Sequence, residues 1–337
     1  MNLYTYVSDL SQSFSSLRHS RTIRAELDQK ALELTTGQRS SQDIARTAET
    51  GRVAAIDRSL AFLDTIERAV EGANVRTSAT QAALGSIRDG TRNLMLGVLS
   101  VTSTESSQTV EIQAREAIQE LDSVVAALNT SVAGVSIFSG AATDQAAVTD
   151  AATILSDVEG ILAAAPDVAT ALTTVDFYFN DPTGGYLSST YTGSTDPGPD
   201  VTIGEGETVG FDIRADNDAV RETLRNVALV AAVANGAFAG TAEDNNAILT
   251  DAATGHLETS DALVRLQEGL GYVEERIQHA EARNEASRLR LQLSRNDIAA
   301  VDPYDAAARF EDLEAQVQRH YVVTSRLSDL SLVNFLR

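Results

Sequence analysis

Residues 261–301 read DALVRLQEGLGYVEERIQHAEARNEASRLRLQLSRNDIAAV. Apolar, small or uncharged side chains recur there in alternating steps of three and four: Leu263, Leu266, Leu270, Val273, Ile277, Ala280, Asn284, Ser287, Leu291, Ser294, Ile298 and Val301. Such a seam predicts one long helix with a narrow buried stripe. At 1.5 Å per residue this helix would be about 60 Å long, more than a compact domain needs. The stretch therefore predicts an elongated, rod-like protein.

Two further series with the same spacing lie earlier in the chain. One runs from Leu63 to Val101 and the other from Ala114 to Val132, with polar residues 102–104 between them. Several of their positions hold Ala or Thr, which suit close packing of several helices better than a two-stranded zipper. Residues 43–140 and 251–301 are therefore predicted to form a multi-helix bundle.

The two ends of the chain carry the same kind of stripe. At the N-terminal end it consists of Leu3, Val7, Leu10, Phe14 and Leu17, before helix-breaking residues at 35–37. After Pro303 it consists of Phe310, Leu313, Val317, Leu327, Leu330 and Leu336. A stripe this narrow cannot stabilise an isolated helix. Residues 1–42 and 302–337 are therefore predicted to form paired terminal helices, packed within one subunit and across its neighbours.

The composition changes between residues 141 and 250. Four of the five prolines lie there, and the segment holds 17 Asp+Glu but only three Arg. Short runs at 175–179, 201–203 and 209–213, bounded by turn residues, predict strands. Residues 141–250 are thus predicted to form an acidic, β-rich domain that is inserted in the bundle and exposed to water. The fold class predicted for the whole chain is mainly α, with a small α+β insert.

Charge and residue usage exclude several kinds of protein. The net charge of −22, from 26 Lys+Arg and 48 Asp+Glu, disfavours nucleic acid and anionic membranes as partners. There is no cysteine, which excludes disulfides and thiolate sites. The first residues lack the basic and apolar regions of a cleaved signal peptide, and no run resembles a membrane span. A cytoplasmic protein, or one exported without a cleaved signal, is expected.

No motif predicts catalysis, a cofactor or a metal site. The four histidines are scattered, and no two have the spacing of metal ligands. Residues 204–210 (GEGETVG) miss the dinucleotide fingerprint by one residue, and their acidic side chains would repel a pyrophosphate. Asp212, Asp216 and Asp218 lack the glycine and distal glutamate of an EF-hand loop. We therefore expect a protein that is not an enzyme.

Short segments of the chain resemble the flagellin superfamily. LDQKALELTTGQR (27–39) is similar to its heptad helix that ends in a Leu-(Ser/Thr)-(Ser/Thr)-Gly-x-Arg turn. GVSIFSG (134–140), the late insert at 201–230 and the closing SDLSLVNFLR (328–337) resemble the junction proteins of this superfamily, which lie between hook and filament. SSQDIARTAETGR (40–52) lacks the Asp-Asp-Ala-Ala-Gly-Leu run that is usual in flagellins.

The resemblance implies a structural, non-catalytic subunit at the hook–filament junction of the bacterial flagellum, outside the cell. Such a subunit would be exported unfolded through the flagellar type III pathway, without a cleaved signal. Its implied partners are copies of itself, the first hook-associated protein, flagellin, and an export chaperone at the C-terminal helix. A flagellin and a cytoplasmic coiled-coil scaffold are the alternatives left open.

Overall fold

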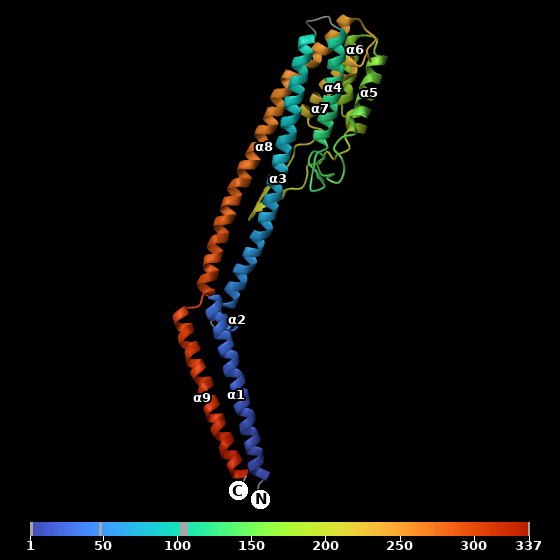
Figure 1. Cartoon of the computed structure of the whole chain (residues 1–337). Coiled ribbons are helices and arrows are strands. Elements are labelled where there is room, and N and C mark those ends of the chain that lie inside the picture. The colour runs from blue at the N-terminus through green and yellow to red at the C-terminus, as the bar shows by residue number, and fades with distance from the viewer. Residues whose placement is uncertain (1–2, 47–48, 102–106, 336–337) are drawn as a thin grey trace. The chain divides into compact units, whose positions relative to one another are not determined.

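The computed structural model is mainly helical, as the sequence predicts. It describes the backbone of residues 3–46, 49–101 and 107–335, and side chains within 14–45, 49–100 and 115–326. The five longest helices described are α1 (Leu3–Thr36), α3 (Thr50–Val101), α4 (Ser107–Leu128), α8 (Ala242–Ala299) and α9 (Pro303–Phe335) (Figure 1). A short helix, α2 (Ser41–Arg46), follows α1. The break predicted at 102–104 lies outside the described residues.

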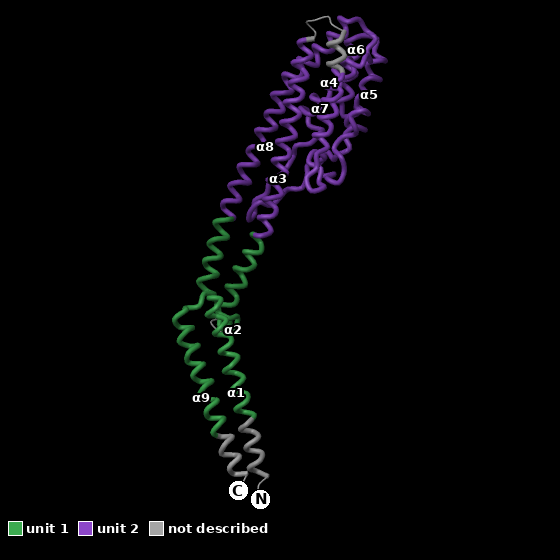
Figure 2. Tube along the Cα trace, viewed as in Figure 1, with its two compact units in different colours: residues 1–63, 285–337 green, residues 64–284 purple. Residues whose placement is uncertain are grey.

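Contacts divide the chain into two compact units. Unit 1 comprises residues 1–63 and 285–337, and unit 2 comprises residues 64–284 (Figure 2). Both borders fall inside long helices, because α3 and α8 each contribute to both units. Unit 1 thus holds α1, α2, α9 and one end each of α3 and α8.

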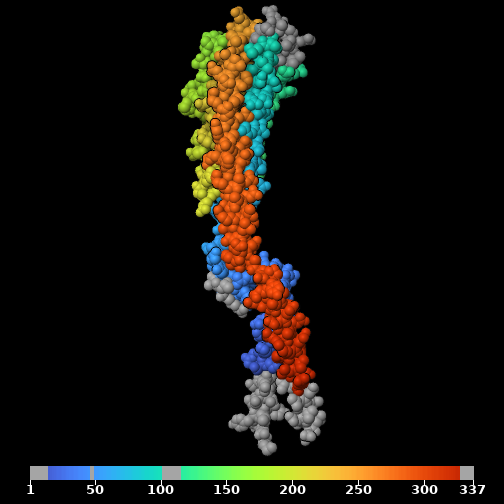
Figure 3. All heavy atoms as spheres, turned by 90° about the vertical axis from the view of Figure 1, so that its left-hand side faces the viewer, coloured from blue at the N-terminus to red at the C-terminus, as the bar shows by residue number. Residues whose placement is uncertain are grey.

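The predicted seams of α3 and α8 coincide with buried positions in unit 2. Ile66 and Val70 of α3 are buried, as are Leu263 and Ile277 of α8. Threonine is tolerated in the seam because its hydroxyl can bond within its own helix; that of Thr77 donates to the carbonyl of residue 73 at 2.7 Å. Outside the seam α8 stays exposed, and Figure 3 shows it lying along one surface of the molecule.

Unit 2 has a large core in which α7 (Asp218–Ala234) is the central helix. Thirteen of its residues are buried, and α4, α5 (Ala151–Ala164) and α6 (Val168–Asn180) pack against it. A smaller cluster lies where the hairpin of β3 (Val201–Gly204) and β4 (Glu207–Val209) covers α3 and α8. Unit 2 therefore has a large buried core within the single chain, although Leu96, Leu257 and Tyr272 are exposed.

Residues 141–250 are not β-rich, contrary to the prediction. They contain α5, α6, α7, a π-helical turn (Tyr186–Thr190) and the start of α8. Within 141–250, all of which the structure describes, β3 and β4 are the only strands. The predicted strand at 175–179 lies inside α6. There the Asp167 carboxylate caps the helix by accepting the Thr170 N–H at 2.8 Å, and Val175 and Phe179 fall on one buried face. Burial at helical spacing overrides the β-propensity of these residues.

The third predicted helix also ends earlier than its apolar series. α4 stops at Leu128, and β1 (Ser131–Val132) and β2 (Val135–Ser136) form a hairpin instead. Gly134 occupies the left-handed region, with φ of +80°, which favours glycine and turns the chain. The extended segment expected after Gly134 is confirmed at β2.

The FSG segment is a crossing point of three loops. Phe138 is fully buried, and its carbonyl accepts the Ala215 N–H at 2.9 Å. The Ser139 carbonyl accepts the Ser194 N–H at 2.8 Å. Gly140 has φ of +62°, and a side chain there would collide with the carbonyls of residues 194 and 196. The segment therefore has a structural role that requires this glycine.

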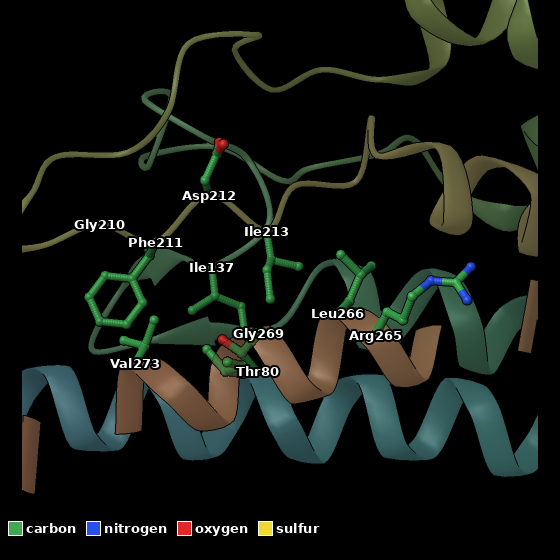
Figure 4. A pocket seen from close by; sticks show the side chains of 11 residues that line it. Thr80, Ile137, Gly210, Phe211, Asp212, Ile213, Arg265, Leu266, Gly269 and Val273 are labelled. Carbon is green, nitrogen blue, oxygen red and sulfur yellow. The ribbon is translucent and has the colours of Figure 1, made fainter. Parts of the chain in front are cut away.

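A small apolar hollow of about 250 Å³ lies in unit 2 between α8 and the chain at 210–213 (Figure 4). Ile137, Phe211 and Leu266 line it, Arg265 lies at one end, and Asp212 points to the side of its loop away from α8. It holds no pair of groups suited to acid–base or nucleophilic chemistry. No group of three or more metal-binding side chains, and no helix able to cross a membrane, occurs among the described residues.

Glu120 gives a test of the packing in unit 2. It lies half-buried on α4, where a side chain added at Gly90 of α3 would overlap it. Burial raises the pKa of its carboxyl to about 7. For an acid with a raised pKa, the ionised form destabilises the fold above that pKa, and the penalty vanishes below about pH 4.5.

We therefore expect Glu120→Gln to stabilise unit 2 by roughly 1–2 kcal/mol at pH 8, after discounting for partial exposure, and to have little effect at pH 4.5. Thermal unfolding at the two pH values measures this. Asp122→Asn, at an exposed position of the same helix, is the control. A loss of stability at pH 8 would contradict the packing described.

Candidate functional site: the terminal helix pair

The terminal helices begin and end at residues whose chemistry sets these limits. α1 ends as predicted at the Thr-Thr-Gly turn, where Gly37 has φ of +68° and its N–H donates to the Glu33 carbonyl at 2.8 Å. Glycine suits this left-handed position. α9 begins at Pro303, and the preceding Asp302 accepts the Tyr304 N–H at 2.9 Å. Proline at the first helical position and an aspartate cap are favourable helix starts.

A short backbone ladder joins the end of α1 to the end of α8. The Arg39 N–H donates to the Ala299 carbonyl at 2.7 Å, and the Val301 N–H donates to the Gly37 carbonyl at 3.1 Å. The Arg39 guanidinium also donates to the Ile298 carbonyl at 3.3 Å. The Gly-x-Arg turn that follows α1 is therefore bonded to the segment that leads from α8 into α9.

The only lysine of the chain anchors this joint. Lys30 Nζ lies 2.6 Å from Glu33 Oε2 and 2.5 Å from Asp43 Oδ2. The other Glu33 oxygen accepts the Ser40 N–H at 2.8 Å. Burial alone would raise the pKa of Glu33, but hydrogen bonds from Lys30, Ser40 and Gln29 outweigh it and lower the pKa to about 2. Burial opposes the charge on Lys30 too, but bonds to Asp43 and Glu33 raise its pKa.

Glu33→Gln is expected to destabilise unit 1 by about 3 kcal/mol at neutral pH, because the lowered pKa equals that much stabilisation of the charged form. The depressed pKa makes this contribution complete above about pH 4.5 and lost as the pH falls towards 2. Because the pKa of Lys30 is raised, its contribution to the stability of unit 1 is complete below about pH 10.5 and is lost at higher pH. Urea unfolding followed by helix content measures both.

Glu49→Gln is the matched control, since it removes a partly exposed ion pair with Arg52 and such pairs contribute less than about 1 kcal/mol. Equal effects of the two substitutions would contradict the role assigned to the Lys30 network.

The two terminal helices run side by side as an antiparallel pair (Figure 1). Ile23 of α1 is buried, whereas Phe310, Leu313 and Val317 of α9 are half-buried. The Ser16 hydroxyl lies 3.2 Å from His320 Nε2. Polar contacts thus share the narrow seam with apolar ones, and the pair buries little of its own apolar surface.

Much of the apolar surface of the pair faces solvent. Phe14 is 61% exposed and Leu17 is 57% exposed, although both belong to the predicted stripe. Tyr321, Val322 and Val323 of α9 are each more than half exposed. The predicted site residues Leu3, Val7, Leu10, Leu327, Leu330 and Leu336 have side chains outside the described part. The role of all eleven predicted residues in assembly stays a prediction.

Three exposed residues, Tyr321 to Val323, are absent from the predicted stripe. Val322 and Val323 fall off the three-and-four series, whereas Tyr321 fits it, four residues after Val317. Their signal is a run of bulky apolar residues on what would otherwise be the polar face of a helix. Leu32 of α1, which is 64% exposed, gives the same signal. The Lys30 network was missed as well, although a single lysine in an Arg-rich chain marks the position.

The net charge is confined to one unit. Unit 2 holds 33 Asp+Glu against 11 Lys+Arg, so it carries all of the −22, whereas unit 1 holds 15 of each and is neutral. Like charge on unit 2 opposes association between copies, but unit 1 offers no such net repulsion. Unit 1 is therefore the better candidate for self-association.

Comparisons with known proteins agree with the resemblance read from the terminal segments. Residues 257–336 match the family model of the bacterial flagellin C-terminal helical region. The fold is similar to a Vibrio parahaemolyticus structure assigned to a flagellar hook-associated protein, with TM-score 0.53 and 13% identity over 74% of this chain and 97% of that one. Bacillus cereus FlgL gives TM-score 0.50 and 14% identity over 72% and 99%. No curated protein matches at the sequence level. The resemblance to flagellins is thus confirmed in the C-terminal helical region, residues 257–336.

Proposed function

We propose that this flagellin-like chain is a structural, non-catalytic subunit of the bacterial flagellum, at the junction between hook and filament. The observation that carries the proposal is the exposed apolar surface of the α1–α9 pair, on a chain whose residues 257–336 match the flagellin C-terminal region. The fold likeness to hook-associated proteins supports the junction in particular.

The energetics favour assembly through the terminal pair. Phe14, Leu17 and the three residues 321–323 are each more than half exposed, and burying one such side chain fully contributes roughly 1.5–3 kcal/mol. A neighbouring copy can supply the surface that one chain lacks. The order of these helices is then coupled to association.

The rest of the chain follows from this division of roles. Residues 1–42 and 302–337 would form the assembly core, residues 43–140 and 251–301 the helical rod, and residues 141–250 the displayed insert. The charge of unit 2 keeps neighbouring inserts apart in water. Adjacent partners would be the first hook-associated protein on one side and flagellin on the other.

Export follows from the resemblance rather than from the geometry. Members of the flagellin superfamily leave the cell unfolded, without a cleaved signal, so we propose the same route here. The exposed apolar face of α9 is a surface that a cytoplasmic export chaperone could cover until assembly.

A flagellin is the second candidate, favoured by the family model that matches at residues 257–336. Labelling the protein on isolated flagella separates the candidates. A band at one end of the filament supports the junction role, and decoration of the full length supports a flagellin. Absence of label from flagella would overturn both and favour the cytoplasmic scaffold.

Substituting Leu313→Asp or Val317→Asp should block incorporation into flagella while unit 2 stays folded. Burying an unpaired carboxylate in an apolar seam is strongly unfavourable, and we expect at least a ten-fold loss of assembled protein by immunoblot of isolated flagella. Gln318→Asp, at an exposed position of the same helix, is the matched control. Normal incorporation of either seam variant would show that these helices do not assemble the protein.

Deleting the gene should leave cells with hooks but without filaments, because flagellin then has no platform on which to assemble. Electron microscopy of cells and an immunoblot of flagellin in the medium measure this. Filaments of normal length on the deleted strain would overturn the junction role.

A further inference from the structure

Charges along the α1–α9 pair are sorted into two zones, although unit 1 is neutral as a whole. The basic zone comprises residues 14–25 of α1 and 315–326 of α9. It contains Arg18, Arg21, Arg24, Arg319 and Arg326, and no Asp or Glu. The chain has almost twice as many acidic as basic side chains, so two 12-residue segments without a carboxylate are a distinct feature.

The acidic zone lies directly beside it, towards the Gly37–Arg39 joint. It comprises residues 26–33 of α1, and Asp302 with residues 303–314 of α9. Eight carboxylates and two cations occupy it: Glu26, Asp28, Glu33, Asp302, Asp305, Glu311, Asp312 and Glu314, with Lys30 and Arg309. The two zones therefore have opposite net charge.

The antiparallel pairing aligns each zone across the two helices. Ser16 meets His320, and the Arg24 guanidinium lies 5.3 Å from the Tyr321 ring centre, both within the basic zone. An open groove where the two zones adjoin carries charges of both signs. It is lined by Arg21, Glu26 and Lys30 from α1 and by Arg309 and Asp312 from α9. One end of the described pair is thus basic on both helices, and the other is acidic on both.

These charges are available to a partner. The five arginines of the basic zone are exposed and make no ion pair with a carboxylate in the described part of the chain. Five exposed carboxylates of the acidic zone likewise have no ion pair among described residues: Glu26, Asp28, Glu311, Asp312 and Glu314. Exposed apolar side chains accompany both sets, with Phe14 and Leu17 in the basic zone and Leu32 in the acidic zone.

We infer that a second copy of this chain docks on the terminal pair with an axial offset, so that the basic zone of one copy faces the acidic zone of the next. The zone centres lie about 10 to 12 residues apart along each helix, which corresponds to an offset of roughly 15–20 Å. The inference deepens the proposed self-assembly and rests on it.

Electrostatics select this arrangement over packing in register. Side-by-side copies without an offset would place five unpaired arginines against five others, and like charges at close range oppose association. With the offset, unpaired cations meet unpaired carboxylates, and the apolar side chains of both zones still become buried. The Debye length of about 8 Å at physiological salt confines the effect to adjacent copies, so the charges define the register between neighbours.

Charge reversal with rescue tests the arrangement in cells. Replacing Arg18, Arg21 and Arg24 by Glu should lower incorporation into flagella about ten-fold or more. Adding Glu311→Arg, Asp312→Arg and Glu314→Arg to the same chain should restore it, because the reversed zones again face each other. Arg92→Glu with Arg265→Glu, at exposed positions of unit 2, is the control and should incorporate normally. Loss without rescue would overturn the offset.

Cross-linking measures the offset without depending on altered charge. Because the chain has no cysteine, chains carrying Thr22→Cys in the basic zone or Ala308→Cys in the acidic zone introduce one thiol each. When both chains are expressed together, oxidation of isolated flagella should join Thr22→Cys to Ala308→Cys in preference to either homodimer, since a disulfide needs close Cα atoms.

The outcomes separate this inference from the proposed function. Protein present on flagella with only same-zone homodimers would overturn the offset and leave the structural role standing. Protein absent from flagella, for the wild-type chain as well as the variants, would overturn both.

Discussion

The geometry of a helix pair is the constraint on which this molecule depends. Two helices can bury only the stripes that face each other, so the remaining apolar side chains stay in solvent unless a third helix covers them. In the α1–α9 pair the facing stripe includes Ile23 and half-buried Leu313 and Val317. Phe14 of the same pair keeps 61% of its surface exposed. Association with other copies is the direct physical remedy.

Unit 2 meets the same constraint by different means. There α7 is surrounded by α4, α5 and α6, and its residues are buried on nearly every face. The hairpin of β3 and β4 covers a further part of α3 and α8. Unit 2 thus has a large core within a single chain, whereas the α1–α9 pair has only a narrow seam. The restriction of net charge to unit 2 agrees with this, because a surface meant to stay in water benefits from repulsion.

The long helices could be predicted because their period is the direct consequence of burial on one face. The end of α1 and the start of α9 were also predictable, since Gly37 and Pro303 act through local backbone chemistry alone. Residues 175–179 could not be placed correctly, because their β-branched and aromatic character is compatible with either a strand or a buried helix face. Whether these residues form a strand or a helix depends on packing against α7, about 40 residues later in the sequence.

The candidate site was predictable only in part, for a related reason. Periodicity identifies which side chains share a face, and it marked Phe14, Leu17, Leu313 and Val317 as one set. It does not tell which of them a single chain can cover, and two of the four prove to be largely exposed. The Lys30–Glu33–Asp43 network joins residues 13 positions apart through a turn, and it has no period to reveal it.

Amide hydrogen exchange in the free and assembled protein tests the central claim most directly. If the terminal pair depends on neighbours, residues 14–25 of α1 and 315–326 of α9, which lie away from the Lys30 network, should exchange rapidly in the monomer and slowly in assembled flagella. Exchange in α7 should be slow in both. Equal and strong protection of α1, α9 and α7 in the monomer would contradict the account, because the terminal pair would then be stable without a partner.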